Sequence, residues 1–266
     1  MHDRNRVERQ RGRIADRPEH ALRARLREHQ ARVARTLDVI HDWLDRYPDT
    51  YVAWSGGKDS TALAHLANIV KPGIPIVHYD SGLDFPETGP YLAEVATRYG
   101  FRYESIRTGD ALEEMIRGGT WDHEADGGYD PAVFWDALVA GPHREARRRY
   151  GDGMLIGLRA EESAKRHRTL RWHHGELHRP DGTHSCAPLG LWTTADVWAY
   201  HHVHGIPEHP VYTRLVELGA PDSALRLDVA IGSNANQYGR LMWLRRGWPE
   251  LWRRYQQVLP RLKEMS

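Results

Sequence analysis

The chain has 266 residues, and its 40% hydrophobic content supplies enough apolar material for a packed core, which excludes a disordered chain. This length fits one α/β domain with additions. The net charge of +1 excludes a global attraction to nucleic acid. A single cysteine, Cys186, excludes an intrachain disulfide, a four-cysteine iron–sulfur cluster and a cysteine-only zinc site. Because no apolar run resembles a secretory signal or a bilayer span, we expect a cytoplasmic protein with no membrane contact.

The first part of the chain is basic. Residues 1–35 hold eleven Arg against five Asp or Glu, a surplus of six, so the remaining residues carry a net charge of about −5. From Pro18 to Tyr47 apolar side chains recur at helical spacing, which predicts a basic arm and one long helix over residues 1–48. The apolar stripe packs on the domain, on a second copy or on a partner subunit. A nucleic acid or an acidic protein is an alternative partner for the basic arm, and a solvated face is the simplest interpretation.

A glycine-containing turn, Ser55-Gly56-Gly57-Lys58-Asp59-Ser60, follows a short apolar run at 51–54 and precedes a helical pattern over 61–70. In a strand-to-helix turn of this kind, backbone N–H groups and the helix N-terminus converge on an anion. The glycines allow a close approach of the backbone, Lys58 adds positive charge, and Ser55 and Ser60 add hydroxyl donors. The turn is therefore a candidate phosphate-binding loop.

Two other interpretations of this turn compete with a phosphate-binding loop. A Walker A loop is excluded because Val52 and Asp59 occupy the positions of its first Gly and of its Ser or Thr. A structural turn with an exposed Lys58 is the simpler alternative. The run is similar to the signature of the N-type ATP pyrophosphatases, which implies that it binds pyrophosphate.

The pattern that follows alternates strands with helices. Strands are predicted over 74–80, 101–106 and 153–159, with helices over 87–99 and 193–205. Such alternation predicts a parallel α/β sheet, in which ligands bind beyond the carboxyl ends of the strands, where Ser55 and Asp80 lie. Residues 111–150 are interpreted as short helices and loops with a solvated arginine face at 144–149, and residues 168–186 as a hairpin or mobile excursion.

A second candidate anion site begins where the fourth predicted strand ends. Gly157 and Arg159 are followed by Glu162, Lys165, Arg166 and Arg168, which brings guanidinium groups to the same edge as the loop. Together with Pro188-Leu189…Trp192-Thr193…Asp196-Val197-Trp198 and Ile206-Pro207…Pro210-Val211-Tyr212, these motifs resemble the phosphoadenosine phosphosulfate reductase family, which includes the small subunit of ATP sulfurylase. The resemblance covers roughly residues 50–215. We therefore divide the chain into an arm and helix (1–48), a nucleotide-binding domain (49–215) and a helical extension (216–266).

The resemblance implies a Rossmann-like (HUP-type) fold that binds ATP or another adenine nucleotide, with Mg²⁺. The single cysteine leaves no ligands for a four-cysteine iron–sulfur cluster. It places the adenine near Ala53, Trp54 and Tyr79, the phosphates on Ser55, Gly56, Gly57, Lys58, Asp59 and Ser60, and ribose or Mg²⁺ near Asp80 and Asp84. It places a second charged group at Gly157 and Arg159, with Glu162, Arg166 and Arg168 as substrate-binding candidates. Lys58, Asp59 and Arg159 are the candidate catalytic residues, although Asp59 has two alternative roles, as a helix cap or as a holder of metal-bound water.

One departure from the family decides between activities. Sulfonucleotide reductases use a nucleophilic cysteine on a C-terminal tail, whereas residues 247–266 contain none and Cys186 precedes the Pro-Leu-x-x-Trp segment. We therefore expect transfer of the adenylyl group of ATP to an anionic acceptor, with release of pyrophosphate. A thiol-dependent reductase is one alternative. A nucleotide-binding regulatory module is another, and it predicts that activity depends on residues 1–35. The many histidines are interpreted as surface or interface residues and not as a zinc site.

Overall fold

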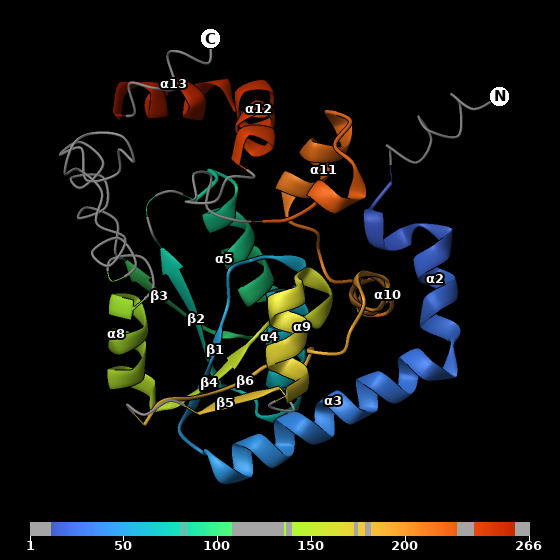
Figure 1. Cartoon of the computed structure of the whole chain (residues 1–266), viewed down its shortest axis with the longest axis vertical. Coiled ribbons are helices and arrows are strands. Elements are labelled where there is room, and N and C mark those ends of the chain that lie inside the picture. Colours follow the sequence, from blue (N-terminus) through green and yellow to red (C-terminus); the bar gives the residue numbers. More distant parts are fainter. Residues whose placement is uncertain are drawn as a thin grey trace.

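The computed structural model describes residues 12–80, 82, 84–107, 136, 140–172, 175–178, 182–227 and 237–258 (Figure 1). A six-stranded sheet has the order β3-β2-β1-β4-β6-β5, in which only β5 runs antiparallel. Its strands are β1 (Thr50–Ala53), β2 (Pro75–Asp80), β3 (Arg102–Arg107), β4 (Gly153–Ile156), β5 (Glu176–His178) and β6 (His184–Cys186). The described α-helices are α2 (Pro18–Arg25), α3 (Arg27–Arg46), α4 (Lys58–Val70), α5 (Thr88–Tyr99), α8 (Gly141–Tyr150), α9 (Ala164–Trp172), α10 (Thr194–His204), α11 (Pro210–Glu217), α12 (Gln237–Gly247) and α13 (Pro249–Val258).

Both faces of the sheet are covered, as the alternation of side chains in β1 shows. Val52 is fully buried in the main core with residues of α3, α4, α5 and α10. Its neighbour Tyr51 packs on the opposite face with Ala146 of α8. A mostly parallel sheet with helices on both faces confirms the predicted α/β class.

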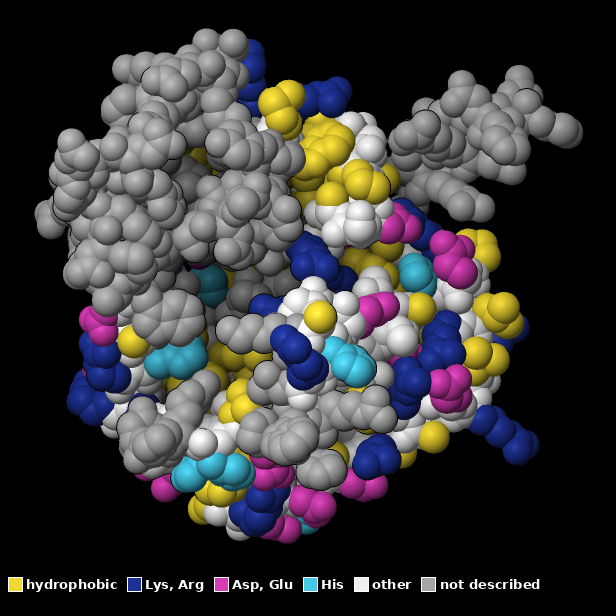
Figure 2. Space-filling view, in the orientation of Figure 1, with side chains coloured by type: hydrophobic (Ala, Val, Ile, Leu, Met, Phe, Trp, Pro, Cys, Tyr) yellow, Lys and Arg dark blue, Asp and Glu magenta, His cyan; other side chains and the backbone are white. Residues whose placement is uncertain are grey.

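The prediction of one long N-terminal helix is wrong. The helix is interrupted at Leu26, whose backbone is extended (φ −74°, ψ 133°), so that α2 and α3 are separate. The interruption brings Arg23 and Arg32, from the two sides of the break, onto the carboxylate of Asp196 on α10. In Figure 1 the two helices run along one edge of the molecule and meet at an angle. Figure 2 shows basic and acidic side chains interspersed over this edge.

Two predicted helix ends are confirmed by their backbone geometry. Gly100 and Gly205 follow α5 and α10 in the left-handed region, with φ of 64° and 59°. Thr193 caps α10, because its side chain accepts from the Asp196 amide while the Asp196 carboxylate accepts from the Thr193 amide. The sequence signals at both ends of α10 were therefore sufficient.

The predictions for residues 144–149 and 168–186 were confirmed in part. The hairpin within 168–186 is confirmed as β5 and β6, but α9 was not predicted. The arginines of α8 lie on an exposed face, where Arg148 and Arg149 pair with Glu145, as predicted for a solvated helix. Residues 1–11, 108–135, His173, His174 and 259–266 lie outside the described residues, so the expectations for them stay predictions. The three-part division of the chain also stays a prediction. None of the described helices combines the length and apolar character needed to cross a membrane.

Candidate functional site

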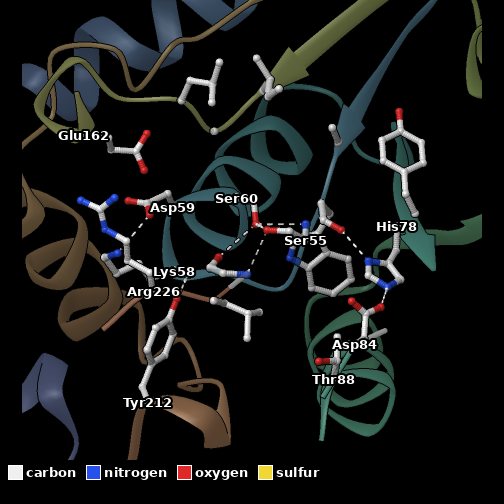
Figure 3. Close-up of a pocket in the computed structure, with 18 of the residues that line it drawn as sticks. Ser55, Lys58, Asp59, Ser60, His78, Asp84, Thr88, Glu162, Tyr212 and Arg226 are labelled. Atoms are coloured by element: carbon white, nitrogen blue, oxygen red, sulfur yellow. Dashed lines mark hydrogen bonds and ion pairs between the residues drawn. The ribbon is translucent and has the colours of Figure 1, made fainter. Parts of the chain in front are cut away.

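A pocket of about 400 Å³ opens at the carboxyl ends of β1, β2 and β4, above the N-terminus of α4 (Figure 3). This volume lies in the range of small-molecule sites. One part of its wall is apolar or aromatic and is formed by Ala53, Tyr79, His143, Ile156 and Leu158. Another part carries the Ser55–Ser60 loop together with charged side chains from distant segments. The pocket therefore joins an apolar wall to the polar Ser55–Ser60 loop.

Glycines allow the loop and β4 to come together. Gly56 has a φ of 77°, a conformation that other residues rarely adopt. A Cβ atom on Gly157 would lie 2.9 Å from the Ser60 amide nitrogen and 3.0 Å from its Cα atom. Because those neighbours are backbone atoms that cannot turn away, only glycine fits where β4 passes the N-terminus of α4.

The loop is held by its own side chains and by α11. The Ser55 amide donates to Ser60 Oγ (3.2 Å), and the Ser60 hydroxyl donates to the Gly57 carbonyl (3.1 Å). The Lys58 amide donates to the hydroxyl of Tyr212 (3.0 Å). The first amide bonded to the preceding turn is that of Thr61, at 2.9 Å from the Gly57 carbonyl, so the amides of residues 58–60 precede the helical ladder. Because Tyr212 occupies the Lys58 amide, the amides of Asp59 and Ser60 are the ones available to an anion.

Three charged side chains at the loop are linked in a row, and the two cations, Lys58 and Arg159, are buried. The ammonium of Lys58, which is 5% exposed, lies 3.2 Å from one oxygen of Asp59. The other oxygen of Asp59 accepts from Arg159 Nε at 2.6 Å. The guanidinium of Arg159 also donates to Glu161 and to the Trp192 carbonyl, and it is only 3% exposed. Asp59 therefore links two cations, and the prediction that it caps α4 is wrong because Gly57 is the N-cap residue.

On the opposite side of the loop, His78 connects β2 to the segment before α5. Its Nε2 lies 3.0 Å from an oxygen of Asp84, and its Nδ1 lies 3.0 Å from the Trp54 carbonyl. Burial opposes a charge on His78, but the hydrogen bond and negative charge of Asp84 outweigh it and raise the pKa of the imidazole. Since the Trp54 amide also donates to the Val77 carbonyl (2.8 Å), both backbone polar groups of Trp54 are engaged.

Comparison with known proteins identifies the family and the fold. Residues 49–219 match the phosphoadenosine phosphosulfate reductase domain. The chain belongs to this family. A sulfate adenylyltransferase subunit 2 from Alkalilimnicola ehrlichii is 26% identical over 206 residues, which cover 67% of this chain and 62% of that protein. A phosphoadenosine 5'-phosphosulfate reductase from Xylella fastidiosa is 29% identical over 175 residues, which cover 64% of this chain and 70% of the reductase.

Solved structures agree at the level of fold. A phosphoadenylyl-sulfate reductase from Candida auris superposes with a TM-score of 0.51 at 17% identity, covering 68% of this chain and 84% of that chain. A U34-tRNA thiolase from Methanococcus maripaludis superposes with a TM-score of 0.50 at 14% identity, covering 89% and 80% of the two chains. At these identities the likeness establishes the α/β fold alone.

The structure brings most of the predicted residues of this family member to one pocket. Those that line it are Ala53, Trp54, Ser55, Gly57, Lys58, Asp59, Ser60, Tyr79, Asp84, Gly157, Glu162 and Arg166. Four predicted residues do not line it: Gly56, Asp80, Arg159 and Arg168. Asp80 instead accepts from the Gly82 amide (2.9 Å), and Arg168 is exposed on α9. Arg159 acts on the site through Asp59.

Eight residues of the pocket were missed from the sequence: His78, Thr88, His143, Ile156, Leu158, Tyr212, Arg226 and Leu227. A signal existed for four of them. Ile156 and Leu158 flank Gly157 in the strand predicted over 153–159. His78 lies in the predicted strand next to Tyr79, and Tyr212 ends the quoted Pro210-Val211-Tyr212 motif. Nothing in the sequence pattern placed Arg226 or Leu227 beside a loop that lies more than 160 residues earlier.

The carboxylates of the pocket are already partnered. Asp59 pairs with two cations, Asp84 bonds His78, and Glu162 accepts from the Arg159 amide (3.1 Å) and from Arg166. In the described part of the chain, no group of three His, Cys, Asp or Glu side chains is arranged to hold a metal ion. The described residues thus do not fit a cation site made of protein ligands alone.

Cys186 lies away from the pocket, in β6. It is 1% exposed, and burial raises the pKa of its thiol to about 12. Because the thiolate is the reactive form, this environment makes the cysteine inert at neutral pH. The interpretation of Cys186 as a small buried residue is confirmed.

Proposed function

We propose that the chain binds ATP in this pocket, cleaves it between the α and β phosphates, and transfers the adenylyl group to an anionic acceptor. The observation that supports this best is the shape and polarity of one pocket. An apolar wall at Ala53, Tyr79 and Ile156 suits a purine, and the loop with Lys58 and Arg226 suits a polyphosphate. Membership of a nucleotide-processing family supports the same assignment.

In the proposed reaction an acceptor oxygen attacks the α-phosphorus. The bond between that phosphorus and the oxygen bridging to the β-phosphorus breaks, and pyrophosphate leaves with the bonding electron pair. The leaving group gains negative charge, which the amides of the first turn of α4 and the Lys58 ammonium would stabilise. An acceptor that is already an anion needs no general base.

The residues then divide by role. Lys58 is the candidate catalytic residue because it is a cation that lines the pocket from within the loop. Asp59 and Arg159 are positioning residues, since Asp59 fixes the ammonium at 3.2 Å and Arg159 fixes Asp59 at 2.6 Å. Arg166 lines the same pocket and would orient the acceptor. Mg²⁺ would enter with the nucleotide, held mainly by its phosphates and waters.

A partner subunit is part of this proposal. One relative is named as subunit 2 of a sulfate adenylyltransferase, which supports association with another chain. Apolar side chains in α2 and at the break after it remain exposed, with Leu22 64% and Leu26 42% accessible. We propose that the N-terminal helices take part in that association.

The test combines binding with turnover. Calorimetry with the non-cleavable analogue α,β-methylene-ATP should show binding to the full chain, and ATP with inorganic sulfate as the acceptor probe should release pyrophosphate. Lys58→Met should lower the rate about a hundredfold or more, the scale of losing one preorganised charge in a transition state. The matched control is Lys71→Met, on an exposed lysine just beyond the other end of α4.

Several results would reject parts of the proposal. Failure of the analogue to bind, or unchanged turnover in Lys58→Met, overturns the assignment of the pocket. Binding of the nucleotide without release of pyrophosphate from ATP, whichever anionic acceptor is supplied, favours the non-catalytic alternative. If thioredoxin-dependent release of sulfite from phosphoadenosine phosphosulfate is found, the chain is a reductase. The burial of Cys186 predicts that Cys186→Ser leaves every measured activity unchanged.

A further inference from the structure

Both ring nitrogens of His78 face oxygen atoms that accept hydrogen bonds. Nδ1 lies 3.0 Å from the carbonyl oxygen of Trp54, and Nε2 lies 3.0 Å from one carboxylate oxygen of Asp84. Because a carbonyl oxygen can only accept, the bond to Trp54 requires a proton on Nδ1. A neutral imidazole has a single N–H, which this bond already uses.

The contact between Nε2 and Asp84 therefore requires a second proton, on the ring or on the carboxyl group. With ordinary pKa values of about 6.5 for histidine and about 3.9 for aspartate, the imidazole is the stronger base by about 400-fold. Burial opposes the charge on the ring, but the hydrogen bond and negative charge of Asp84 outweigh it and raise the pKa of His78. His78, only 6% exposed, is thus an imidazolium at neutral pH.

Titratable groups on neighbouring elements leave this charge in place. Asp80, at the end of β2, adds negative charge that favours the imidazolium. His209, the N-cap residue of α11, is neutral because burial and the charge of His78 lower its pKa to about 4. Tyr103 of β3 and Tyr255 of α13 interact with Asp84, and burial raises the pKa of each phenol, so both are neutral as well.

The bond from Nδ1 reaches the first peptide unit of the Ser55–Ser60 loop. The Trp54 carbonyl and the Ser55 amide belong to the same planar unit, so the orientation of one fixes that of the other. The Ser55 amide donates to Ser60 Oγ (3.2 Å), and the Ser60 hydroxyl donates to the Gly57 carbonyl (3.1 Å). His78 thus orients a peptide whose hydrogen bonds continue across the loop. In Figure 3 the charged pair of Lys58 and Asp59 lies beyond Ser60, on the far side of the loop from His78.

Removal of one proton from His78 would not affect its two contacts equally. The bond to Asp84 has a charged acceptor and belongs to the stronger class, so the remaining proton stays on Nε2. Nδ1 would then direct a lone pair at the lone pairs of the Trp54 carbonyl oxygen, 3.0 Å away. Because that contact is repulsive, loss of the proton acts on the peptide between Trp54 and Ser55.

We infer that His78 is a positioning residue for the Ser55–Ser60 loop and that it acts as an imidazolium, with one N–H bonded to Asp84 and the other orienting the peptide between Trp54 and Ser55. The effect on the loop needs no ligand. His78 also lines the pocket, so an anion held by the loop binds more weakly once His78 has lost a proton. This second effect, on nucleotide binding, rests on the proposed function.

The first experiment replaces His78 by two amides that each retain one of its bonds. Asparagine places its NH₂ group near the position of Nδ1, where it can donate to Trp54, whereas glutamine reaches the position of Nε2, where it can donate to Asp84. Both variants lose the same charge, so their comparison isolates the bond to Trp54. Calorimetry at neutral pH should show that His78→Gln binds α,β-methylene-ATP about tenfold more weakly than His78→Asn. Equal affinities overturn the inference, provided that thermal unfolding shows both variants folded.

The second experiment uses the wild-type chain and needs no ligand. Long-range ¹H–¹⁵N NMR correlations of the ring should show both nitrogens of His78 protonated at neutral pH, and a neutral ring overturns the inference. As the pH is raised until the ring loses a proton, the amide resonances of Ser55 and Ser60 should move with the same midpoint. Amide resonances that do not follow the ring also overturn the inference.

The pH dependence of nucleotide binding connects the two experiments. The affinity of wild type for α,β-methylene-ATP, divided by that of His78→Asn at each pH, should fall about tenfold as the ring of His78 loses its proton. The division removes the titration of the nucleotide's own phosphates, and an unchanged ratio contradicts the second effect. If the analogue binds to none of the three chains, the proposed function is rejected, while the NMR titration still decides the role of His78.

Discussion

Replacing Asp196 by asparagine should destabilise the chain more than any other single loss of charge at the N-terminal helices. The Asp196 side chain is completely buried. One oxygen accepts from Arg23 (2.8 Å) and lies 3.1 Å from the His29 ring, and the other accepts from Arg32 (2.5 Å) and from Thr193. An asparagine would keep one acceptor and turn an NH₂ group toward these donors.

The magnitude follows from burial. Breaking a buried ion pair by removing one partner costs about 3–5 kcal/mol, because the remaining charge is left uncompensated. For a chain of this size each kcal/mol lowers the unfolding temperature by about 2–4 °C, so Asp196→Asn should unfold about 6–20 °C lower than wild type. The measurement is thermal unfolding followed by circular dichroism at neutral pH and low salt.

The control is Asp222→Asn, which also breaks an arginine–aspartate pair made by the N-terminal segment. Its carboxylate is 72% exposed, and exposed pairs contribute about 0–1 kcal/mol. We therefore expect a shift of at most about 4 °C. Equal shifts in the two variants would refute the reasoning, because burial would then not decide the strength of the pair.

The protonation of Asp196 adds a dependence on pH. Burial opposes its charge, but the bonds from His29, Arg23 and Thr193 outweigh it and lower the pKa far below the usual range. A carboxylate with a lowered folded-state pKa contributes stability above its unfolded pKa of about 3.9, and that contribution is lost as the pH falls further. The difference between wild type and Asp196→Asn should therefore shrink in acid.

Two further predictions concern the core and the loop. Burial keeps three histidines neutral by lowering the pKa of each to about 4: His65, His201 and His209. Because the unfolded chain binds protons at these histidines at a higher pH than the folded chain does, the free energy of unfolding should fall as the pH drops from about 6.5 to 4. The midpoint of urea unfolding should decrease over this interval, and an unchanged midpoint contradicts the prediction. Gly157→Ala should weaken binding of α,β-methylene-ATP and lower the unfolding temperature, because the new Cβ atom would press on the backbone of α4. The control is Gly89→Ala, which should do neither because no atom lies within 4 Å of a Cβ atom at that position. Similar effects of the two changes would refute the packing argument.

The sequence predicted those parts of the fold that depend only on residues close together in the chain. The strand-to-helix turn, the left-handed Gly100 and the Thr193 cap depend on residues within a few positions of one another. The break at Leu26 could not be predicted in the same way, because the helical spacing continues through it. What decides the break is Asp196, which lies 170 residues later and draws side chains from both sides onto one carboxylate.

The candidate site likewise contains residues that the sequence predicted and residues that only the packing of distant segments brings in. The residues of the loop were predicted because their types and spacing are typical of a strand-to-helix turn that is suited to phosphate. The direct role predicted for Arg159 is not what the structure arranges, since Asp59, Glu161 and Thr194 surround its guanidinium. Arg226 and Tyr212 join the site through the packing of the C-terminal segments, which no spacing rule expresses.

Helix α10 connects the N-terminal arm to the Ser55–Ser60 loop, and this affects how the alternative functions can be separated. At one end Asp196 holds α2 and α3, and Thr194 bonds Arg159 and Glu161. Two turns further on, His201 Nε2 lies 2.8 Å from the Lys58 carbonyl.

Deleting residues 1–35 would strip Asp196 of Arg23, His29 and Arg32, and would thereby disturb the helix that supports Lys58. A loss of activity on truncation would thus follow whether the arm is regulatory or structural. A change confined to the arm's exposed surface, such as Arg27→Glu, leaves these contacts intact and separates the two, because only a regulatory arm would then alter activity.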